Sequence, residues 1–303
     1  MQDKIVRNFH DAYIKADHEG LKLLWKEETP KSLIKYYPAK YEQTDVNYFL
    51  DGISNNTLWL SSPSLFNDPF DGVINANYSA EALLSECIGK DIAKSLLSYS
   101  DLKELADNVA ESLKEKNEGK HLYFENSLYM TCFTEKENLY SSRMWAHYAN
   151  NHSGVCVEFD FASVSNISPF ACIPVRYTDD YRYLLIPNNV SDDVTNFMRF
   201  FTKAKEWEYE KEWRVAQQSQ LFMKGYNVPI SSPIAVYLGC RVSEKLKNDV
   251  MATCENIPVY QMRMKPGTFQ FYYDLIIRDP IFLDGKSDVT SILPKNTSQG
   301  EQQ

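Results

Sequence analysis

Residues 207–215 read WEYEKEWRV, an alternation of aromatic and acidic side chains. Side chains of a β-strand point alternately to its two faces, so this spacing predicts a strand with Glu208, Glu210 and Glu212 on one face. The aromatic side chains would share the other face: Trp207, Tyr209 and Trp213. Carboxylates this close raise one another's pKa. A cation, a sugar hydroxyl or a buried arginine would relieve the repulsion, whereas an exposed edge strand would leave the acids in solvent.

The composition limits the classes of protein to which the chain can belong. Its 303 residues suit one large domain or two small ones. The formal net charge of −9 argues against general, phosphate-driven binding of nucleic acid, although a local basic groove is compatible with it. Aromatic residues reach 14%, and such rings fill a core or line a cleft.

The cysteine pattern and the lack of targeting signals favour a reducing compartment. The six cysteines form no CxxC pair, and no histidine stands at zinc-finger spacing from a cysteine pair. The first residues, MQDKIVR, are not followed by an apolar signal segment. No run approaches the ~20 apolar residues of a membrane span. We therefore expect a cytoplasmic protein without a metal centre and without a membrane partner.

Hydrophobic periodicity predicts an α+β fold with a mixed or antiparallel sheet. A helical period over residues 1–30 predicts an N-terminal helical extension. Residues 31–283 are then a single α+β domain that carries a helical insertion over 79–119, and the polar residues 284–303 predict a disordered tail. Strands are predicted at 33–37, 57–60, 127–134, 154–160, 172–177, 212–217, 233–239, 257–262 and 269–277. Helices of the domain are predicted at 144–149, 191–206 and 243–255.

A turn rich in side-chain acceptors follows the second predicted strand. Residues 66–72 read FNDPFDG, in which Asn67 caps its own turn and Asp68-Pro69 favours turn initiation. One interpretation is an Asx turn anchored by its two phenylalanines. The other places Asn67, Asp68 or Asp71 in a cleft.

A second polar and aromatic cluster occupies residues 143–154, RMWAHYANNHSG. Its two histidines lie five positions apart, which does not place both on one helix face, so a metal site from this pair is not favoured. Trp145, His147 and Tyr148 are candidates for an aromatic wall against a planar ligand. The alternative is a core-packing helix that ends at Gly154. We expect this cluster, the FNDPFD turn and the acidic strand to converge on one pocket, because pockets combine apolar walls with a few polar groups.

Four segments of the chain match one family pattern, whereas no P-loop, dinucleotide-binding or nucleophile-elbow signature is present. They are LWLSSPSLFNDPFDG, CFTE, RMWAHYANNHSGVCVEFD and KAKEWEYEKEWRVA. Together they resemble DUF2971, a widespread bacterial family of unknown function, over roughly residues 33–275. The family pattern carries a KYR-like triplet in its first strand, where this chain has Lys35-Tyr36-Tyr37. The departure removes an arginine from a place where an anion would be held.

A second resemblance, to ADP-ribosyltransferases of the Arg-Ser-Glu type, concerns mechanism. These enzymes present, in chain order, a basic residue on the first strand, a Ser-x-Ser motif and a Glu-x-Glu motif. The chain offers Lys35 or Arg7 for the first, Ser62-Pro63-Ser64 for the second and Glu210-Lys211-Glu212 for the third.

The second resemblance implies NAD as the substrate and a pair of catalytic glutamates. Glu212 would stabilise the oxocarbenium-like cation that forms at the ribose, and Glu210 would activate the acceptor. The implied substrate-binding residues are Lys35, Ser62, Ser64, Asn67, Asp68, Trp145, His147, Tyr148 and Arg214. The acceptor, protein or nucleic acid, is not specified. A role as a bacterial toxin or phage-defence effector, with an antitoxin as partner, rests on association.

Two other functions remain open at this stage. In the first, a Mg²⁺-dependent nuclease, oxygen ligands would come from acidic residues: Asp68, Asp71, Glu158, Asp160 and Glu212. The second is a non-catalytic module that binds a ligand or a partner through its aromatic residues.

Overall fold

A computed structural model describes residues 2–15, 17–41, 48–68, 70–71, 104, 107–108, 126–168, 172–179, 192–220 and 223–276. The predicted insertion over 79–119, apart from residues 104 and 107–108, and the predicted tail over 284–303 lie outside these ranges. The division of the chain into extension, domain and tail therefore stays a prediction.

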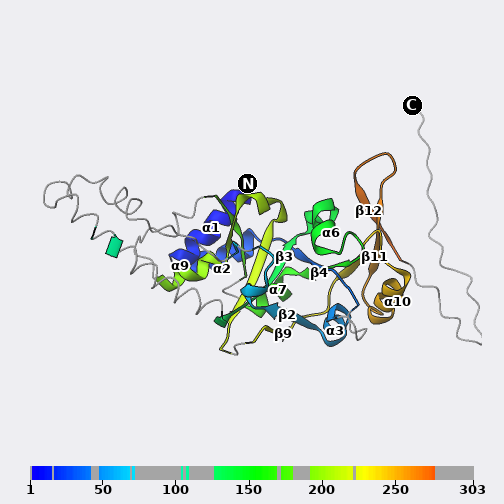
Figure 1. Ribbon diagram of the computed structural model, residues 1–303, viewed down its shortest axis with the longest axis horizontal. Helices are drawn as coiled ribbons and strands as arrows, with labels where there is room; N and C mark the ends of the chain where they lie inside the picture. The colour runs from blue at the N-terminus through cyan, green and yellow to red at the C-terminus, as the bar shows by residue number, and fades with distance from the viewer. Residues whose placement is uncertain are drawn as a thin grey trace, which may run out of the picture.

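The described part is an α+β fold with a mixed sheet, as the sequence predicts (Figure 1). Its helices are α1 (Gln2–Ile14), α2 (His18–Glu27), α3 (Tyr48–Asn55), α6 (Ser142–Tyr148), α7 (Phe161–Ile167), α9 (Asp192–Arg199) and α10 (Glu244–Thr253). Short 3₁₀ segments are η1 (Pro63–Leu65), η3 (Lys136–Tyr140) and η4 (Lys205–Glu210). The longer strands are β1 (Ser32–Tyr37), β2 (Thr57–Ser61), β3 (Leu128–Glu135), β4 (Val155–Asp160), β8 (Glu212–Gln218), β9 (Gly225–Pro229), β10 (Ala235–Leu238), β11 (Val259–Met264) and β12 (Phe271–Leu275). The shortest are β5 (Cys172–Pro174), β6 (Arg176–Tyr177) and β7 (Thr202–Lys203).

The main sheet has ten strands in the order β12-β11-β10-β4-β1-β3-β2-β9, with β8 paired to β3 and β5 paired to β8. All pairs are antiparallel except β10 with β11. β6 and β7 form a separate parallel pair. No helix of the described ranges is long and apolar enough to cross a lipid bilayer.

The sheet divides along one edge of β3. At one end of that edge β1 pairs through Ile34 with Thr134, and further along β2 pairs through Ser61 with Met130. Within the described chain, no strand pairs with the stretch of this edge between Met130 and Thr134. A side chain takes that place, because Lys35 Nζ donates to the carbonyl oxygen of Cys132 at 3.1 Å. The division opens the sheet where the candidate site lies.

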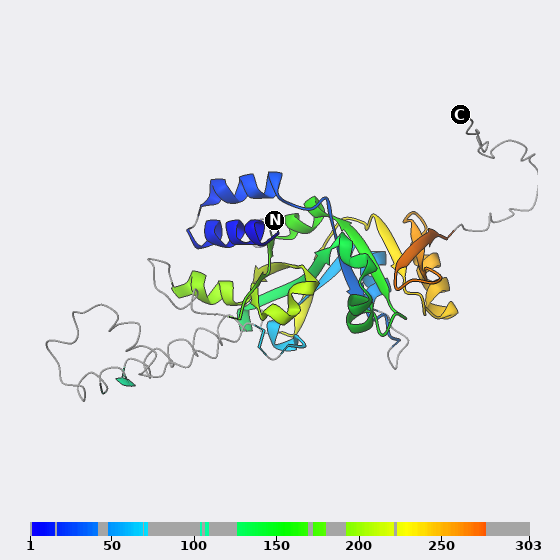
Figure 2. The ribbon, with the colours of Figure 1, turned by 90° about the horizontal axis from the view of Figure 1, so that it is seen from above.

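Helices cover both faces of the sheet, so that it carries two apolar clusters. On one face α6 buries Trp145 against Ile34 and Tyr36 of β1. On the other face Trp213 lies between Phe9 of α1 and Phe161 of α7, with ring centroids 5.6 and 5.4 Å away. Figure 2 shows α1 and α2 side by side beside the sheet, at the end opposite β12.

The predicted strand over residues 207–215 is wrong in its first half. Residues 205–210 form η4, Lys211 adopts a left-handed conformation with φ 45°, and β8 begins only at Glu212. The three acids therefore do not share a face, since Glu208 is exposed whereas Glu210 and Glu212 are buried. The turn is held from a distant part of the chain: Thr134 Oγ1 and Asn138 Nδ2 both donate to the carbonyl oxygen of Glu210.

Smaller differences have local causes. The predicted helix 191–206 ends at Arg199, after which Phe200 and Phe201 are buried and the chain enters β7. The predicted strand 172–177 is interrupted at Val175, just after Pro174, whose ring nitrogen has no hydrogen to donate. Helix α7 and strand β9 were not predicted; the carboxylate of Asp160 caps α7 by accepting from two backbone N–H groups.

Candidate functional site

A cavity of about 130 Å³ lies where the sheet divides. Its lining comes from β1, β3, β8, the FNDPFD turn, α6, β7 and the end of η4. The polar and charged lining residues are Lys35, Asn67, Asp71, Cys132, Thr134, Tyr148, Lys203, Glu210, Glu212 and Arg214. The ring of Phe66 adds an apolar wall. The predicted convergence of the three clusters is thus found for Asn67, Tyr148 and the two glutamates.

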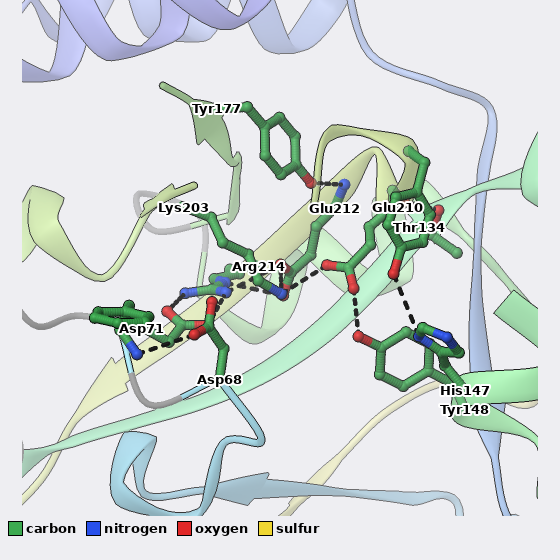
Figure 3. A network of polar contacts seen from close by, with 12 residues as sticks. Asp68, Asp71, Thr134, His147, Tyr148, Tyr177, Lys203, Glu210, Glu212 and Arg214 are labelled. Carbon is green, nitrogen blue, oxygen red and sulfur yellow. Dashed lines mark hydrogen bonds and ion pairs between the residues drawn. The ribbon is translucent and has the colours of Figure 1, made fainter. Parts of the chain in front are cut away.

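Arg214 is the fixed centre of the site and has no exposed surface. Its guanidinium binds Asp71 through two bonds of 2.6 Å and Glu212 through bonds of 2.9 and 3.0 Å (Figure 3). It also donates to the carbonyl oxygen of Phe200 at 2.7 Å. Glu212 and Arg214 are two positions apart on β8, so their side chains leave the strand on the same face. A fully paired buried arginine of this kind orients its carboxylates rather than leaving them free to move.

Glu210 is held by two side chains from other elements. Lys203 Nζ of β7 lies 2.7 Å from Glu210 Oε2 and 3.6 Å from Glu212 Oε2. The hydroxyl of Tyr148, at the end of α6, donates to the other oxygen of Glu210. In Figure 3 the two glutamates lie side by side, Glu212 toward Arg214 and Glu210 toward Tyr148.

The pKa values of the two glutamates are shifted in opposite directions. Burial of Glu212 by itself favours the neutral acid, but Arg214 and Lys203 outweigh it and hold its pKa at about 2. For Glu210, burial and the charge of Glu212 raise the pKa, against the opposing attraction of Lys203. Glu212 is therefore a permanent carboxylate, whereas Glu210 exchanges its proton at a higher pH than an ordinary glutamate.

Several predicted residues lie elsewhere than expected. Trp145 has only 1% of its surface exposed, donates its indole N–H to the carbonyl oxygen of Leu139 and packs on the ring of Tyr36. It forms no wall of the cavity, so the core-packing interpretation of this residue is the one found. His147 is exposed and its Nδ1 lies 3.3 Å from the hydroxyl of Tyr209. The helix that carries both residues is nonetheless part of the site, because it supplies Tyr148.

The serine motif and Asp68 have structural partners. The hydroxyls of Ser62 and Ser64 lie 2.8 Å apart, and Ser62 caps η1; neither serine lines the cavity. Asp68 accepts from the backbone N–H of Phe70 at 2.9 Å, as an Asx turn requires. In the same turn, Asn67 and Asp71 line the cavity.

Three residues that hold the site were not predicted as part of it: Lys203, Thr134 and Asn138. Lys203 lies in the matched segment KAKEWEYEKEWRVA, and its closeness in sequence to Glu210 and Glu212 could have indicated that it pairs with them. Thr134 and Asn138 gave no such signal, because their contacts with Glu210 span more than seventy positions of the chain.

The acidic residues considered as Mg²⁺ ligands do not gather. Glu158 accepts from Ser32, Tyr237 and Lys136, and Asp160 caps α7. Asp71 and Glu212 share Arg214 rather than an open coordination site. Within the residues that the structure describes, no group of three or more His, Cys, Asp or Glu side chains is placed to hold a metal ion.

The comparison with protein families agrees with the sequence pattern. Residues 144–215 match the family model of a protein of unknown function, DUF2971. The predicted resemblance is thereby confirmed over this range. The DUF2971 segment contains the site residues Tyr148, Lys203, Glu210, Glu212 and Arg214. Comparison with curated proteins and with solved structures finds no significant match.

Proposed function

We propose that the protein is an ADP-ribosyltransferase-like enzyme that breaks the nicotinamide–ribose bond of NAD. The observation that supports this proposal is the pair of carboxylates on one cavity wall whose pKa values move in opposite directions. Neighbouring acids whose surroundings push their pKa values apart mark acid–base assignments in enzyme sites. Glycosyl transfer needs one permanent negative charge and one group that exchanges a proton.

Each glutamate has a defined part in the proposed reaction. When the C1–N bond breaks, nicotinamide leaves with the bonding electrons and positive charge develops on the ribose. Glu212, kept ionised by Arg214 and Lys203, faces that charge. Glu210, with its raised pKa, accepts the proton of the incoming nucleophile.

The size of the cavity limits what it encloses. At about 130 Å³ it is smaller than the roughly 300–1,000 Å³ of pockets that enclose drug-sized ligands. We therefore assign it to the nicotinamide–ribose end of the dinucleotide. Trp145 is buried away from the cavity, and the aromatic residues that line it and could contact nicotinamide are Tyr36, Phe66, Phe133 and Tyr148.

The biological setting that fits this chemistry is that of a bacterial toxin or phage-defence effector acting in the cytoplasm and held in check by an antitoxin. The acceptor in that setting is a protein or a nucleic acid. This setting is part of the proposal and rests on association.

The test is release of nicotinamide from NAD by the purified protein, with and without EDTA. We expect release that EDTA does not change. Glu210→Gln removes the proton-exchanging group and should lower turnover by about 10²-fold or more. Glu208→Gln is the matched control, because Glu208 lies in the same short helix but is exposed; it should leave turnover unchanged.

Three outcomes would contradict the proposal. Absence of nicotinamide release from folded protein would exclude NAD cleavage. Equal losses of turnover in Glu210→Gln and Glu208→Gln would show that the effect comes from the general charge of this segment and not from Glu210. EDTA-sensitive cleavage of nucleic acid without NAD consumption would instead support a metal-dependent nuclease.

A further inference from the structure

Lys35 differs from the other two cations of the cavity wall. Arg214 and Lys203 together hold all three carboxylates that line the cavity, Asp71, Glu210 and Glu212. Lys35 has no carboxylate within ion-pair distance in the described part of the chain. Its hydrogen bond there goes to a backbone oxygen, that of Cys132, at 3.1 Å. Among the described residues, Lys35 is thus the cavity-lining amine without a carboxylate partner.

The position of Lys35 in the fold explains this isolation. Its Nζ occupies the gap in the sheet beside β3 and lies 5.7 Å from the ring centroids of Tyr37 and Phe133. Both rings and the carbonyl oxygen attract an ammonium group, but more weakly than a carboxylate does, so burial is the largest influence and favours the uncharged amine. In agreement, burial lowers the pKa of Lys35, against the opposing effects of Cys132 and Glu212. The pKa of Lys203, in the same cavity, is raised because Glu212 and Glu210 outweigh its burial.

We propose that the amine of Lys35 is a nucleophile that binds a small polyhydroxy aldehyde, such as an open-chain sugar, as an imine. An uncharged amine keeps a lone pair after it donates to Cys132, and desolvated lysines are the ones that form Schiff bases in proteins. This proposal does not depend on NAD cleavage, because it requires only that a small aldehyde enters the cavity.

The cavity favours a hydroxylated and uncharged ligand. Carboxylates, Asn67 and the hydroxyl of Tyr148 offer hydrogen-bond partners to several hydroxyl groups. A free anion is disfavoured, because three carboxylates already line the wall and their cations are taken. The volume of about 130 Å³ is well below the roughly 300–1,000 Å³ of pockets for drug-sized ligands, which suits a small molecule.

The reaction balances without an oxidant or a reductant. The Nζ lone pair attacks the carbonyl carbon, the C=O π electrons move to oxygen, and that oxygen takes a proton to give a carbinolamine. Loss of the oxygen as water leaves the imine, so amine plus aldehyde gives imine plus water. Glu210, whose pKa is raised, is suited to supply and recover the proton. Once protonated, the imine carries a positive charge and faces the permanent carboxylate of Glu212.

The experiment uses ribose as the probe and cyanoborohydride as the trap. Cyanoborohydride donates hydride to the iminium carbon and turns the reversible imine into a stable secondary amine, which peptide mass mapping locates. At neutral pH we expect Lys35 to be labelled faster than exposed lysines such as Lys224 and Lys265, because its lowered pKa raises the fraction of free amine, about tenfold for each unit of lowering. Lys203 is the internal control in the same cavity and should stay unlabelled, because it is held in ion pairs.

Two variants complete the test. Lys35→Arg keeps the positive charge but forms no imine, so it should abolish the label at this position and leave the labelling of other lysines unchanged. Glu208→Gln should label at the wild-type rate. Labelling of Lys35 no faster than that of Lys224, or only after unfolding, would overturn the proposal. So would the absence of a ribose adduct combined with protection of Lys35 by inorganic phosphate, since that result assigns the amine to an anion.

The results also separate this proposal from the proposed function. Nicotinamide release without a Lys35 adduct would leave NAD cleavage standing and remove the imine site. A Lys35 adduct in a protein that releases no nicotinamide would support the imine site and exclude NAD cleavage.

Discussion

Arg214 is the residue on which the charge balance of the cavity depends. It is fully buried, and its cost of desolvation is offset by Asp71 and Glu212 together. Removing one partner of a buried pair leaves an uncompensated charge, which costs more than the pair contributes as a whole. Glu212→Gln would likewise remove a partner of Arg214, so it would lower stability as well as the proposed activity. Glu210→Gln is therefore the better test of catalysis.

We predict that Asp71→Asn destabilises the fold by about 3 kcal/mol or more, because it leaves Arg214 with one carboxylate instead of two. Urea unfolding measures the loss. Asp274→Asn is the matched control: Asp274 pairs with Arg263 at 2.8 Å on the surface, where the side chains are 53% and 55% exposed. It should change stability by less than about 0.5 kcal/mol. Similar losses of unfolding free energy in both variants would contradict this prediction, because they would show that the buried Arg214–Asp71 pair affects stability no more than an exposed pair does.

At the scale of elements, the junction between η4 and β8 decides which acids reach the cavity. Lys211 has φ 45° and ψ 50°, a conformation that costs an L-residue about 1–2 kcal/mol. The turn at this residue leaves Glu208 exposed while Glu210 and Glu212 are buried, whereas a continuous strand would have placed all three acids on one face. The strain is offset by the bonds that Thr134 and Asn138 donate to the carbonyl of Glu210.

Lys211→Gly should therefore stabilise the protein by up to about 1 kcal/mol, because glycine adopts this conformation without steric cost. The gain is reduced by about 0.5 kcal/mol through loss of the partly exposed ion pair with Glu135, at 3.7 Å. Lys211→Val should destabilise by about 1 kcal/mol or more, since a branched side chain fits the left-handed region poorly. Thermal unfolding of both variants beside Lys205→Gly, an exposed position at the start of the same helix, gives the comparison. A stabilising valine would contradict this account.

At the scale of the whole molecule, the N-terminal helices support the back of the site. Helix α1 packs Phe9 onto Trp213, the residue between Glu212 and Arg214 on β8. The next residue of α1, His10, is fully buried and its Nε2 lies 2.9 Å from the carbonyl oxygen of Pro174, so this nitrogen carries the proton. Within the described chain its Nδ1 has no hydrogen-bond partner. The contact between helix and sheet therefore depends on an uncharged histidine.

This arrangement predicts a pH dependence of stability. Burial, with a smaller contribution from Arg176, outweighs the bond to Pro174 and lowers the pKa of His10 from 6.5 to about 4. Between these two values the unfolded chain binds a proton that the folded protein does not, so stability falls as the pH falls from 6.5 toward 4. The expected loss from this group is about 2 kcal/mol on going from about pH 7.5 to about pH 5.

Urea unfolding of wild type and His10→Gln at the two pH values measures this contribution. Glutamine keeps an N–H donor for Pro174 but does not titrate, so the variant should lose about 2 kcal/mol less than wild type over the same interval. Parallel losses in the two proteins would show that His10 is not the group responsible.

The sequence by itself determined the class of fold and the region of the site. Alternating or continuous apolar runs located most strands of the sheet, because the side-chain period of a strand is a local property. Local patterns also predicted several of the residues that meet at the cavity. These are Asn67 and Asp71 of the FNDPFD turn, Tyr148, and the closely spaced Glu210, Glu212 and Arg214. Each of these signals lies within a segment of a dozen residues or fewer.

Only the tertiary structure decided what these residues do to one another. The WEYEKEWRV alternation suits a continuous strand, and the turn at Lys211 follows instead from Thr134 and Asn138, far away in the chain. Whether Trp145 faced a ligand or the core depended on β1, which lies more than a hundred positions earlier. The opposite pKa shifts of Glu210 and Glu212, and the position of Lys35 away from the described carboxylates, depend on which cation reaches which carboxylate. Distances of a few ångströms between segments remote in sequence fix these pairings, and no local pattern encodes such distances.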